Sequence, residues 1–138
     1  MSISYKADCA GLTPEQLQDF FQGWPNPPSP DTHLRLLQKS DYIFLAVTDT
    51  GEVVGFITAI TDGVLSAYIP LLEVLPEYQN RGIGQELVRL MLERLTSYYM
   101  VDLLCDSSLQ PFYTRIGMRP ATGMMIRNYE NQNGAAPD

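Results

Sequence analysis

The sequence predicts a mixed α/β domain, in which a mostly antiparallel sheet is flanked by helices. Three apolar runs of strand type follow one another, separated only by short turns at Asp49-Thr50-Gly51 and Thr61-Asp62-Gly63. From residue 71 onward, an apolar run leads into a glycine-rich turn and then into a long amphipathic pattern. Another apolar run, over 100–105, follows that helical pattern. Because a helix must cross over between them, we expect this last strand to run parallel to its predecessor.

The N-terminal part is expected to contribute a short strand and two helices. Residues 3–8 suggest the strand, and Thr13-Pro14-Glu15-Gln16 carries the cap, the N1 proline and the capping-box glutamine of a helix start. The prolines of residues 23–30 end that helix, and Ser29-Pro30 starts the next one. His33, the only histidine, lies on a flank of the second helix and is expected at the surface.

The middle of the chain predicts an antiparallel meander followed by a helix. The three strands cover Tyr42 to Val47, Val53 to Ile60 and Val64 to Leu75. Gly55, inside the second strand, indicates a bulge or a close approach of backbones. The helix runs from Gly84 to about residue 98, since its apolar side chains keep a helical period.

The C-terminal part is expected to close the domain. A short helix is predicted over 107–116 and ends at Gly117. One or two closing strands are then expected over 118–128. We therefore expect a single domain over residues 1–130 and a flexible, polar tail over 131–138.

Composition narrows the possible functions of this 138-residue chain. Its net charge of -7 and the lack of a basic cluster argue against a nucleic-acid partner and favour a cationic substrate. No apolar stretch has the ~20 residues of a membrane span, and the N-terminus lacks a signal-peptide pattern. Cys9 and Cys105 form neither a metal spacing nor a disulfide framework. We expect a cytoplasmic protein without a metal.

The stretch from Leu71 to Val88 predicts an anion site. It reads as a strand, a polar turn with Gly82 and Gly84, and the start of a helix. A helix start presents unpaired N–H groups and about half a positive charge. Glycines let an anion approach those groups, so the simplest ligand is a phosphate.

Two motifs resemble one known family. Gln79-Asn80-Arg81-Gly82-Ile83-Gly84 matches the Gln/Arg-x-x-Gly-x-Gly/Ala signature of the GNAT superfamily of N-acetyltransferases. Pro111-Phe112-Tyr113-Thr114-Arg115-Ile116-Gly117-Met118 is similar to the second family motif, with Met118 in place of the usual phenylalanine. The order of elements resembles the family, in its bacterial single-domain form, from about residue 5 to 128.

The resemblance implies a sheet that splays open between the strands at Val64–Leu75 and Met100–Cys105, with acetyl-CoA in the opening. Its pyrophosphate would rest on the N–H groups of Arg81, Gly82, Ile83, Gly84 and Gln85. Its pantetheine arm would pair with the strand edge at Glu73, Val74 and Leu75. Arg81 is also expected to touch a phosphate. Gln79 either contributes to this site or only holds the turn.

Acetyl transfer to a primary amine, by direct attack in a ternary complex, needs three groups. The resemblance points to the N–H of Val74 or Leu75 as donor to the oxyanion. Tyr113, a phenol with a pKa of ~10, suits the acid that protonates the leaving thiolate. By strand alternation, Glu73 shares a side with Ile69 and Leu71, in an apolar setting that suits a base. Glu73 could equally line the cleft or hold a backbone group, and both readings stay open.

The lack of two glutamates that related enzymes carry supports an alternative function. The strand glutamates of histone-type and ribosomal-protein-type relatives would fall near Tyr68 and Leu103, where this chain has none. A non-catalytic, acyl-CoA-binding regulatory module is therefore the alternative.

The acceptor, a small-molecule or peptide amine, is expected between the loop at 24–30 and the strands at 118–127. The sequence does not distinguish a monomer from a homodimer.

Overall fold

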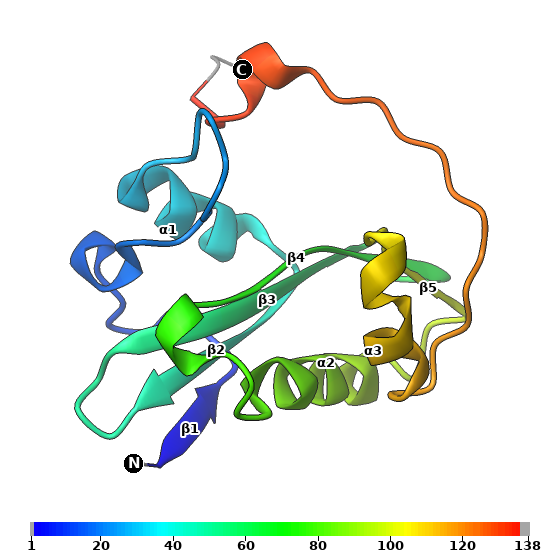
Figure 1. Ribbon diagram of the computed structural model, residues 1–138, viewed down its shortest axis with the longest axis horizontal. Helices are drawn as coiled ribbons and strands as arrows, with labels where there is room; N and C mark the ends of the chain where they lie inside the picture. The colour runs from blue at the N-terminus through cyan, green and yellow to red at the C-terminus, as the bar shows by residue number, and fades with distance from the viewer. Residues whose placement is uncertain (1, 136–138) are drawn as a thin grey trace.

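One five-stranded sheet forms the centre of the molecule, in the order β1-β2-β3-β4-β5 (Figure 1). The computed structural model describes residues 2–135. The first four strands pair antiparallel, and β5 runs parallel to β4, as predicted. The strands are β1 Ile3–Lys6, β2 Tyr42–Thr48, β3 Val53–Thr61, β4 Ser66–Val74 and β5 Met100–Asp102.

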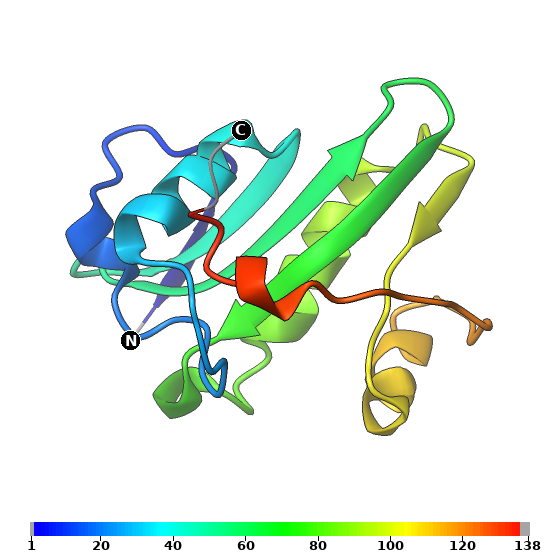
Figure 2. The same cartoon turned by 90° about the horizontal axis from the view of Figure 1, so that it is seen from above.

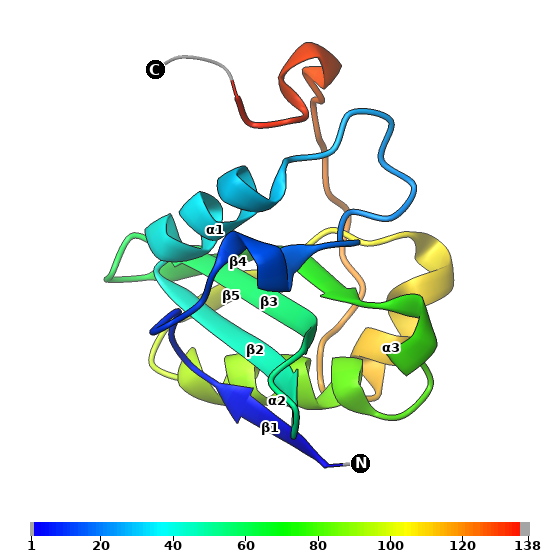
Figure 3. The ribbon, with the colours of Figure 1, turned by 90° about the vertical axis from the view of Figure 1, so that its left-hand side faces the viewer.

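Helices cover both faces of this sheet (Figure 3). α1 (Pro30–Lys39) lies on one face, and α2 (Ile83–Arg94) and α3 (Gln110–Thr114) lie on the other. Ser29 caps α1 as predicted, because its Oγ accepts a hydrogen bond from the N–H of Thr32. Within residues 2–135, no helix is long and apolar enough to cross a membrane.

The face under α1 contains a buried histidine, so the predicted surface position of His33 is wrong. Its side chain is 1% exposed and packs among the rings of Phe20, Phe21 and Phe56. The reason is helical spacing: His33 and the buried Leu37 lie four residues apart on the side of α1 that faces the sheet. Burial lowers the pKa of His33 to about 4.

The first predicted helix is also wrong, because only a 3-10 turn forms at Pro14–Leu17. The capping glutamine does contribute, since its side-chain oxygen accepts a hydrogen bond from the N–H of Thr13. The turn cannot extend, because Asp19 and Phe21 adopt left-handed backbone angles, with φ of 70° and 64°. The chain therefore folds back over the sheet edge after one turn.

A bulge in β4 changes which side chains share a face. Thr58 pairs with Leu71, but Ile60 pairs with Tyr68, so one β3 residue opposes two residues of β4. Ile69 then lies in the core under α2, whereas Leu71 lies in the core under α1. The predicted alternation was therefore wrong for Ile69. Pro70 was the available signal, because proline cannot donate to a ladder.

The sheet splays open between β4 and β5, as predicted (Figure 2). The two strands pair only where Ser66–Tyr68 lies beside Met100–Asp102. β5 ends at Asp102 instead of the predicted Cys105, and β4 continues to Val74 without it. The second half of β4 therefore has one edge free of strand pairing.

The predicted closing strands over 118–128 do not form. This segment has no assigned strand and passes the end of β5 well clear of the sheet (Figure 1). A strand needs a ladder partner, and among the described residues no backbone–backbone hydrogen bond involves 119–127. Farther on, the N–H of Asn26 donates to Gln132 and Arg35 donates to Gly134 O. Flexibility of 131–138 stays a prediction, and 136–138 lie outside the described residues.

Candidate active site

The start of α2 has the geometry of an anion cradle. Gly82 is the N-cap with φ of 84°, and Asn80 before it has φ of 62°. Turns with such left-handed residues commonly form concavities of backbone N–H groups that bind anions. Among the described residues, none accepts a hydrogen bond from the N–H groups of 81–85. The predicted stretch therefore provides donors for an anion.

At the end of β4, the backbone N–H and C=O groups of Val74 face the opening between β4 and β5. The N–H of Leu75 donates to Val54 O at 2.9 Å, so these two residues form a hydrogen-bonded pair. Antiparallel ladders alternate, and the N–H and C=O of Val74 therefore point away from β3, toward the space that β5 has left. Of the two oxyanion donors that the resemblance implies, the N–H of Leu75 is already used in this bond, whereas that of Val74 is not.

Gln79 holds this turn, which is one of the two roles predicted for it. Its side-chain Nε2 donates to the carbonyl oxygen of Val74 at 2.9 Å. The bond ties the cradle to the open strand edge and leaves the N–H of Val74 as the outward donor.

The two sequence motifs meet at this point. A Cβ added to Gly84 would lie 3.7 Å from Val74 Cγ2 and 3.8 Å from Phe112 Cζ. α3 is thus packed against both the helix start and the strand edge, which brings its next residue, Tyr113, to the same region. Burial, and secondarily the nearby Cys105, raise the pKa of Tyr113 above its ordinary value of 10.0. The phenol is therefore protonated at neutral pH.

Glu73 lies on the opposite face of β4, toward α1. One carboxylate oxygen accepts a hydrogen bond from the N–H of Phe21 at 2.8 Å, and the other from the N–H of Gln22 at 3.2 Å. These bonds hold the strained backbone of Phe21 against the sheet. They correspond to the second predicted reading, in which Glu73 holds a backbone group.

Charged side chains surround the cradle. The guanidinium of Arg81 lies 5.1 Å from the ring centroid of Tyr78, an arrangement typical of a cation–π contact. Glu86, in the first turn of α2, forms a bidentate pair with Arg89 at 2.7 and 2.8 Å. The hydrogen bond from Arg89 lowers the pKa of Glu86. This pairing reduces the repulsion that Glu86 would exert on a bound anion.

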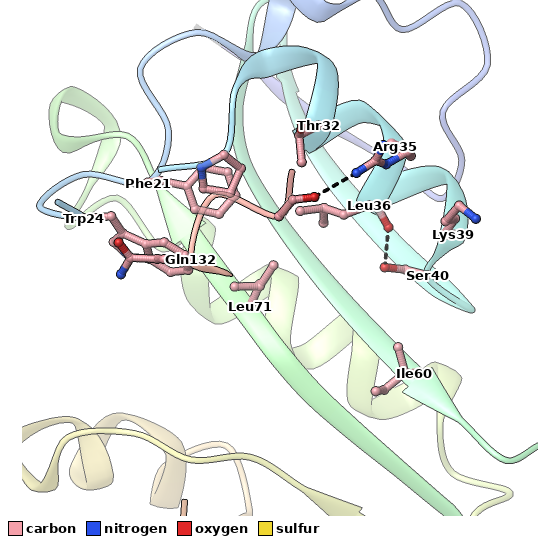
Figure 4. Close-up of a pocket in the computed structure, with 12 residues that line it drawn as sticks. Phe21, Trp24, Thr32, Arg35, Leu36, Lys39, Ser40, Ile60, Leu71 and Gln132 are labelled. Atoms are coloured by element: carbon pink, nitrogen blue, oxygen red, sulfur yellow. Dashed lines mark hydrogen bonds between the residues drawn. The ribbon is translucent and has the colours of Figure 1, made fainter. Parts of the chain in front are cut away.

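A pocket of about 400 Å³ lies on the same face as Glu73 (Figure 4). α1, the 24–30 loop and β4 form its walls, and Leu71, two residues before Glu73, is part of its floor. Sequence reasoning predicted the loop but missed the contribution of α1. The lining residues are Phe21, Trp24, Pro28, Thr32, Arg35, Leu36, Lys39, Ser40, Ile60, Leu71, Gln132 and Gly134.

Comparisons with known proteins agree with the observed fold. The model of the acetyltransferase (GNAT) family matches residues 10–118. A crystal structure from Deinococcus radiodurans R1, assigned to the acetyltransferases, is 46% identical and covers 98% of this chain and 94% of its own, with a TM-score of 0.94. A GNAT family acetyltransferase of Streptococcus pneumoniae is 29% identical and covers 92% and 98%, with a TM-score of 0.75.

A plant protein shares the central part of the sequence. The chloroplastic GCN5-related N-acetyltransferase 3 of Arabidopsis thaliana is 39% identical over 69 residues, which are 49% of this chain. The match spans only 29% of the plant protein's own length.

Proposed function

Because this chain belongs to the GNAT acetyltransferase family, we propose that it transfers the acetyl group of acetyl-CoA to a primary amine, by direct attack within a ternary complex. The observation that supports the proposal is that the start of α2, the edge of β4 at Val74 and α3 lie together, since a Cβ on Gly84 would contact both Val74 and Phe112. The start of α2 and Val74 offer N–H groups, and Tyr113 follows Phe112 in α3.

The residues of the cradle fit acetyl-CoA. Its pyrophosphate is an anion that the free N–H groups of 81–85 suit, and Arg81 adds a positive charge beside them. The amide groups of pantetheine suit an unpaired strand edge. Of the predicted residues Glu73, Val74 and Leu75, Val74 is the one whose backbone points away from β3. The contact of Gly84 with Phe112 closes one side of this opening.

In the proposed reaction, the amine attacks the thioester carbonyl while the N–H of Val74 donates to the developing oxyanion. The C–S bond then breaks, and Tyr113 donates its proton to the departing thiolate, which leaves as the free thiol of coenzyme A. The nitrogen of the new amide releases its extra proton to water, and the Tyr113 phenolate takes up a proton from water. An ordinary alkyl amine has to lose a proton first, at a cost of about 4–5 kcal/mol at pH 7. A role of Glu73 in that step stays a prediction, since its contacts support a positioning role.

We propose that the acceptor enters through the pocket beside α1. This pocket lies on the other side of β4 from α3, so an amine from it and the thioester from the cradle would meet at the strand edge. Aromatic walls and two cationic residues suit a small molecule or a peptide end that carries a carboxylate or an aromatic group. The acidic net charge of -7 supports a small acceptor over a nucleic acid, and we place the reaction in the cytoplasm.

Release of free thiol from acetyl-CoA, measured with a panel of amines, tests the proposal. With an accepted amine, Tyr113→Phe should lower kcat by about 100-fold, within the usual range for a lost general acid, and leave the KM for acetyl-CoA nearly unchanged. Tyr129→Phe, at an exposed position outside the site, is the matched control. Equal rates for Tyr113→Phe and the parent would remove Tyr113 from the mechanism. Tight binding of acetyl-CoA without turnover on any amine would instead favour a regulatory module.

A further inference from the structure

Two basic side chains lie at one wall of the pocket beside α1. Arg35 and Lys39 are one helical turn apart on α1, and both belong to the pocket lining. None of the twelve lining residues is acidic, although the chain has 16 acidic residues and only nine basic ones. Within residues 2–135, neither of these two cations forms an ion pair. The local charge of the pocket is therefore opposite in sign to the net charge of the chain.

The guanidinium of Arg35 is held at this wall by the C-terminal segment (Figure 4). Its Nη2 donates to the carbonyl oxygen of Gly134 at 2.8 Å. A guanidinium carries five N–H donors, so a single bond to a carbonyl leaves most of them available. Carboxylates and phosphates are the groups that pair with these donors in a bidentate manner. Lys39 adds a second positive charge on a flexible stem, so this wall suits an anionic group.

Apolar side chains form the rest of the pocket. Leu71 is part of the floor, and Ile60 of β3, which is 47% exposed, lies at the same end as the cations (Figure 4). At the opposite end, the rings of Phe21 and Trp24 pack with their centroids 4.9 Å apart. A hydrocarbon chain that lies between the two ends would cover this apolar surface.

A carboxylate lies beyond the aromatic end. Phe21 lines the pocket, and its backbone N–H donates to the carboxylate of Glu73 at 2.8 Å. Glu73 follows Leu71 by two residues in β4, on the same face of the sheet. From Arg35 toward Glu73, the surroundings thus change from positive to negative. This pattern of charge is complementary to a molecule with an anion at one end and a protonated amine at the other.

The spacing along β4 sets the length of such a molecule. We place the acetyl group at Val74, three residues beyond Leu71. Three strand residues span about 10 Å. An α-amino acid, whose amine and carboxylate are attached to the same carbon, is too short to reach from Arg35 to that position. An amine that has an apolar chain between its nitrogen and its anionic group has the required length.

We propose that the acceptor is an ω-amino acid or an ω-aminoalkyl phosphate, whose anionic group binds Arg35 and Lys39 while its chain lies on Leu71. Its amine then points to the edge of β4. The proposal rests on the acetyl transfer proposed above and names the substrate class for the same site. It also assigns separate roles to the two scales of charge, since the acidic chain attracts the amine and the local cations select the anion.

The fluorescence of Trp24, the only tryptophan of the chain, reports on this pocket without any turnover. With coenzyme A present, titrations compare ε-aminocaproate with hexylamine, which has the same number of carbons and no anion. The Kd of ε-aminocaproate should be lower by about 10-fold, as expected for hydrogen bonds between charged groups. A Kd no lower than that of hexylamine, or no change in fluorescence with either ligand, would overturn the proposal.

Single variants test whether the two cations bind the anion. Arg35→Gln and Lys39→Gln should each raise the Kd of ε-aminocaproate by about 3- to 10-fold and leave that of hexylamine nearly unchanged. Lys6→Gln, at an exposed position on β1 outside the pocket, removes the same charge and is the matched control. An equal effect on both ligands would contradict the assignment. The comparison of ligands on the parent chain needs no variant.

The length and the nature of the anion are tested on the parent chain as well. Glycine and γ-aminobutyrate should bind more weakly than ε-aminocaproate, because their amines cannot reach the edge of β4 from Arg35. Equal binding of glycine would overturn the proposed length. An aminohexyl phosphate distinguishes the two sources of the anion, since the tighter of the two ligands identifies the preferred group.

Thiol release from acetyl-CoA separates this proposal from that of acetyl transfer. Selective binding of ε-aminocaproate without turnover of any amine would refute acetyl transfer and support the anion site. Turnover of hexylamine with the same kcat/KM as ε-aminocaproate would support acetyl transfer and refute the anion site. Both proposals predict faster turnover of ε-aminocaproate at low concentration, because its KM should be lower.

Discussion

At the scale of residues, we expect His33 to contribute to a loss of stability at low pH. Both ring nitrogens are buried without a hydrogen-bond partner among the described residues, and the neighbouring rings are apolar. A proton there would leave an uncompensated buried charge. This explains why the pKa falls from 6.5 to about 4.

His33→Leu should therefore change how the free energy of unfolding depends on pH. Above pH 6.5 His33 is neutral in both states and contributes no pH dependence, whereas between pH 6.5 and about 4 only the unfolded chain gains the proton. The parent should lose about 3 kcal/mol across that window, in addition to losses that the variant shares. Urea unfolding of both proteins at several pH values measures the difference. Parallel curves would contradict this account.

At the scale of elements, the contact between β4 and the loop that follows the 3-10 turn at Pro14–Leu17 depends on Glu73. Its carboxylate accepts two backbone hydrogen bonds from Phe21 and Gln22, and Phe21 has a left-handed backbone. Loss of this carboxylate would leave those N–H groups without their partner and would release the loop that walls the pocket. Glu73 therefore supports this junction, and its role in the reaction stays a prediction.

Glu73→Gln should lower the free energy of unfolding by about 1–3 kcal/mol, since one of its two acceptors becomes a donor facing an N–H group. Because we assign it a positioning role, the acidic limb of the pH profile of kcat/KM should remain. Glu77→Gln, at an exposed position without such bonds, removes the same charge and is the control. Loss of the acidic limb with unchanged stability would instead identify Glu73 as the base.

At the scale of the whole molecule, the net charge of -7 acts on every approaching substrate. Exposed charges attract or repel over about 10 Å at 0.1 M salt, and added salt screens this effect. If two accepted amines differ only in a second charge, kcat/KM of the more cationic one should fall more steeply with sodium chloride. Thiol release at rising ionic strength measures this. An identical slope for both amines would show that the local cations, Arg35 and Lys39, outweigh the overall field.

Most of the fold could be predicted, because local patterns specify it. Strand runs separated by short turns with Asp and Gly lead to neighbouring strands, and the crossover helix lets β5 run parallel to β4. The cradle at Gly82 follows from the same local chemistry, since positive φ at a helix start favours glycine. The motif around Tyr113 was also readable, because both motifs are short and contiguous.

Only the tertiary structure showed the contacts between segments that are far apart in the chain. The burial of His33 depends on which side of α1 meets the sheet, and the bonds of Glu73 depend on a loop 51 and 52 residues away in the chain. The bulge at Pro70 moved Ile69 to the opposite face, an offset that a strand pattern with strict alternation does not contain.

The sequence by itself determined the sheet order, the family motifs and the anion cradle, because these depend on residues close together in the chain. Residues 118–128 are a segment whose conformation local sequence did not predict. Its apolar residues have strand propensity, but a strand exists only where another segment pairs with it. Within one described subunit no segment does so. Pairing is a property of the folded molecule and its partners, and local sequence does not encode it.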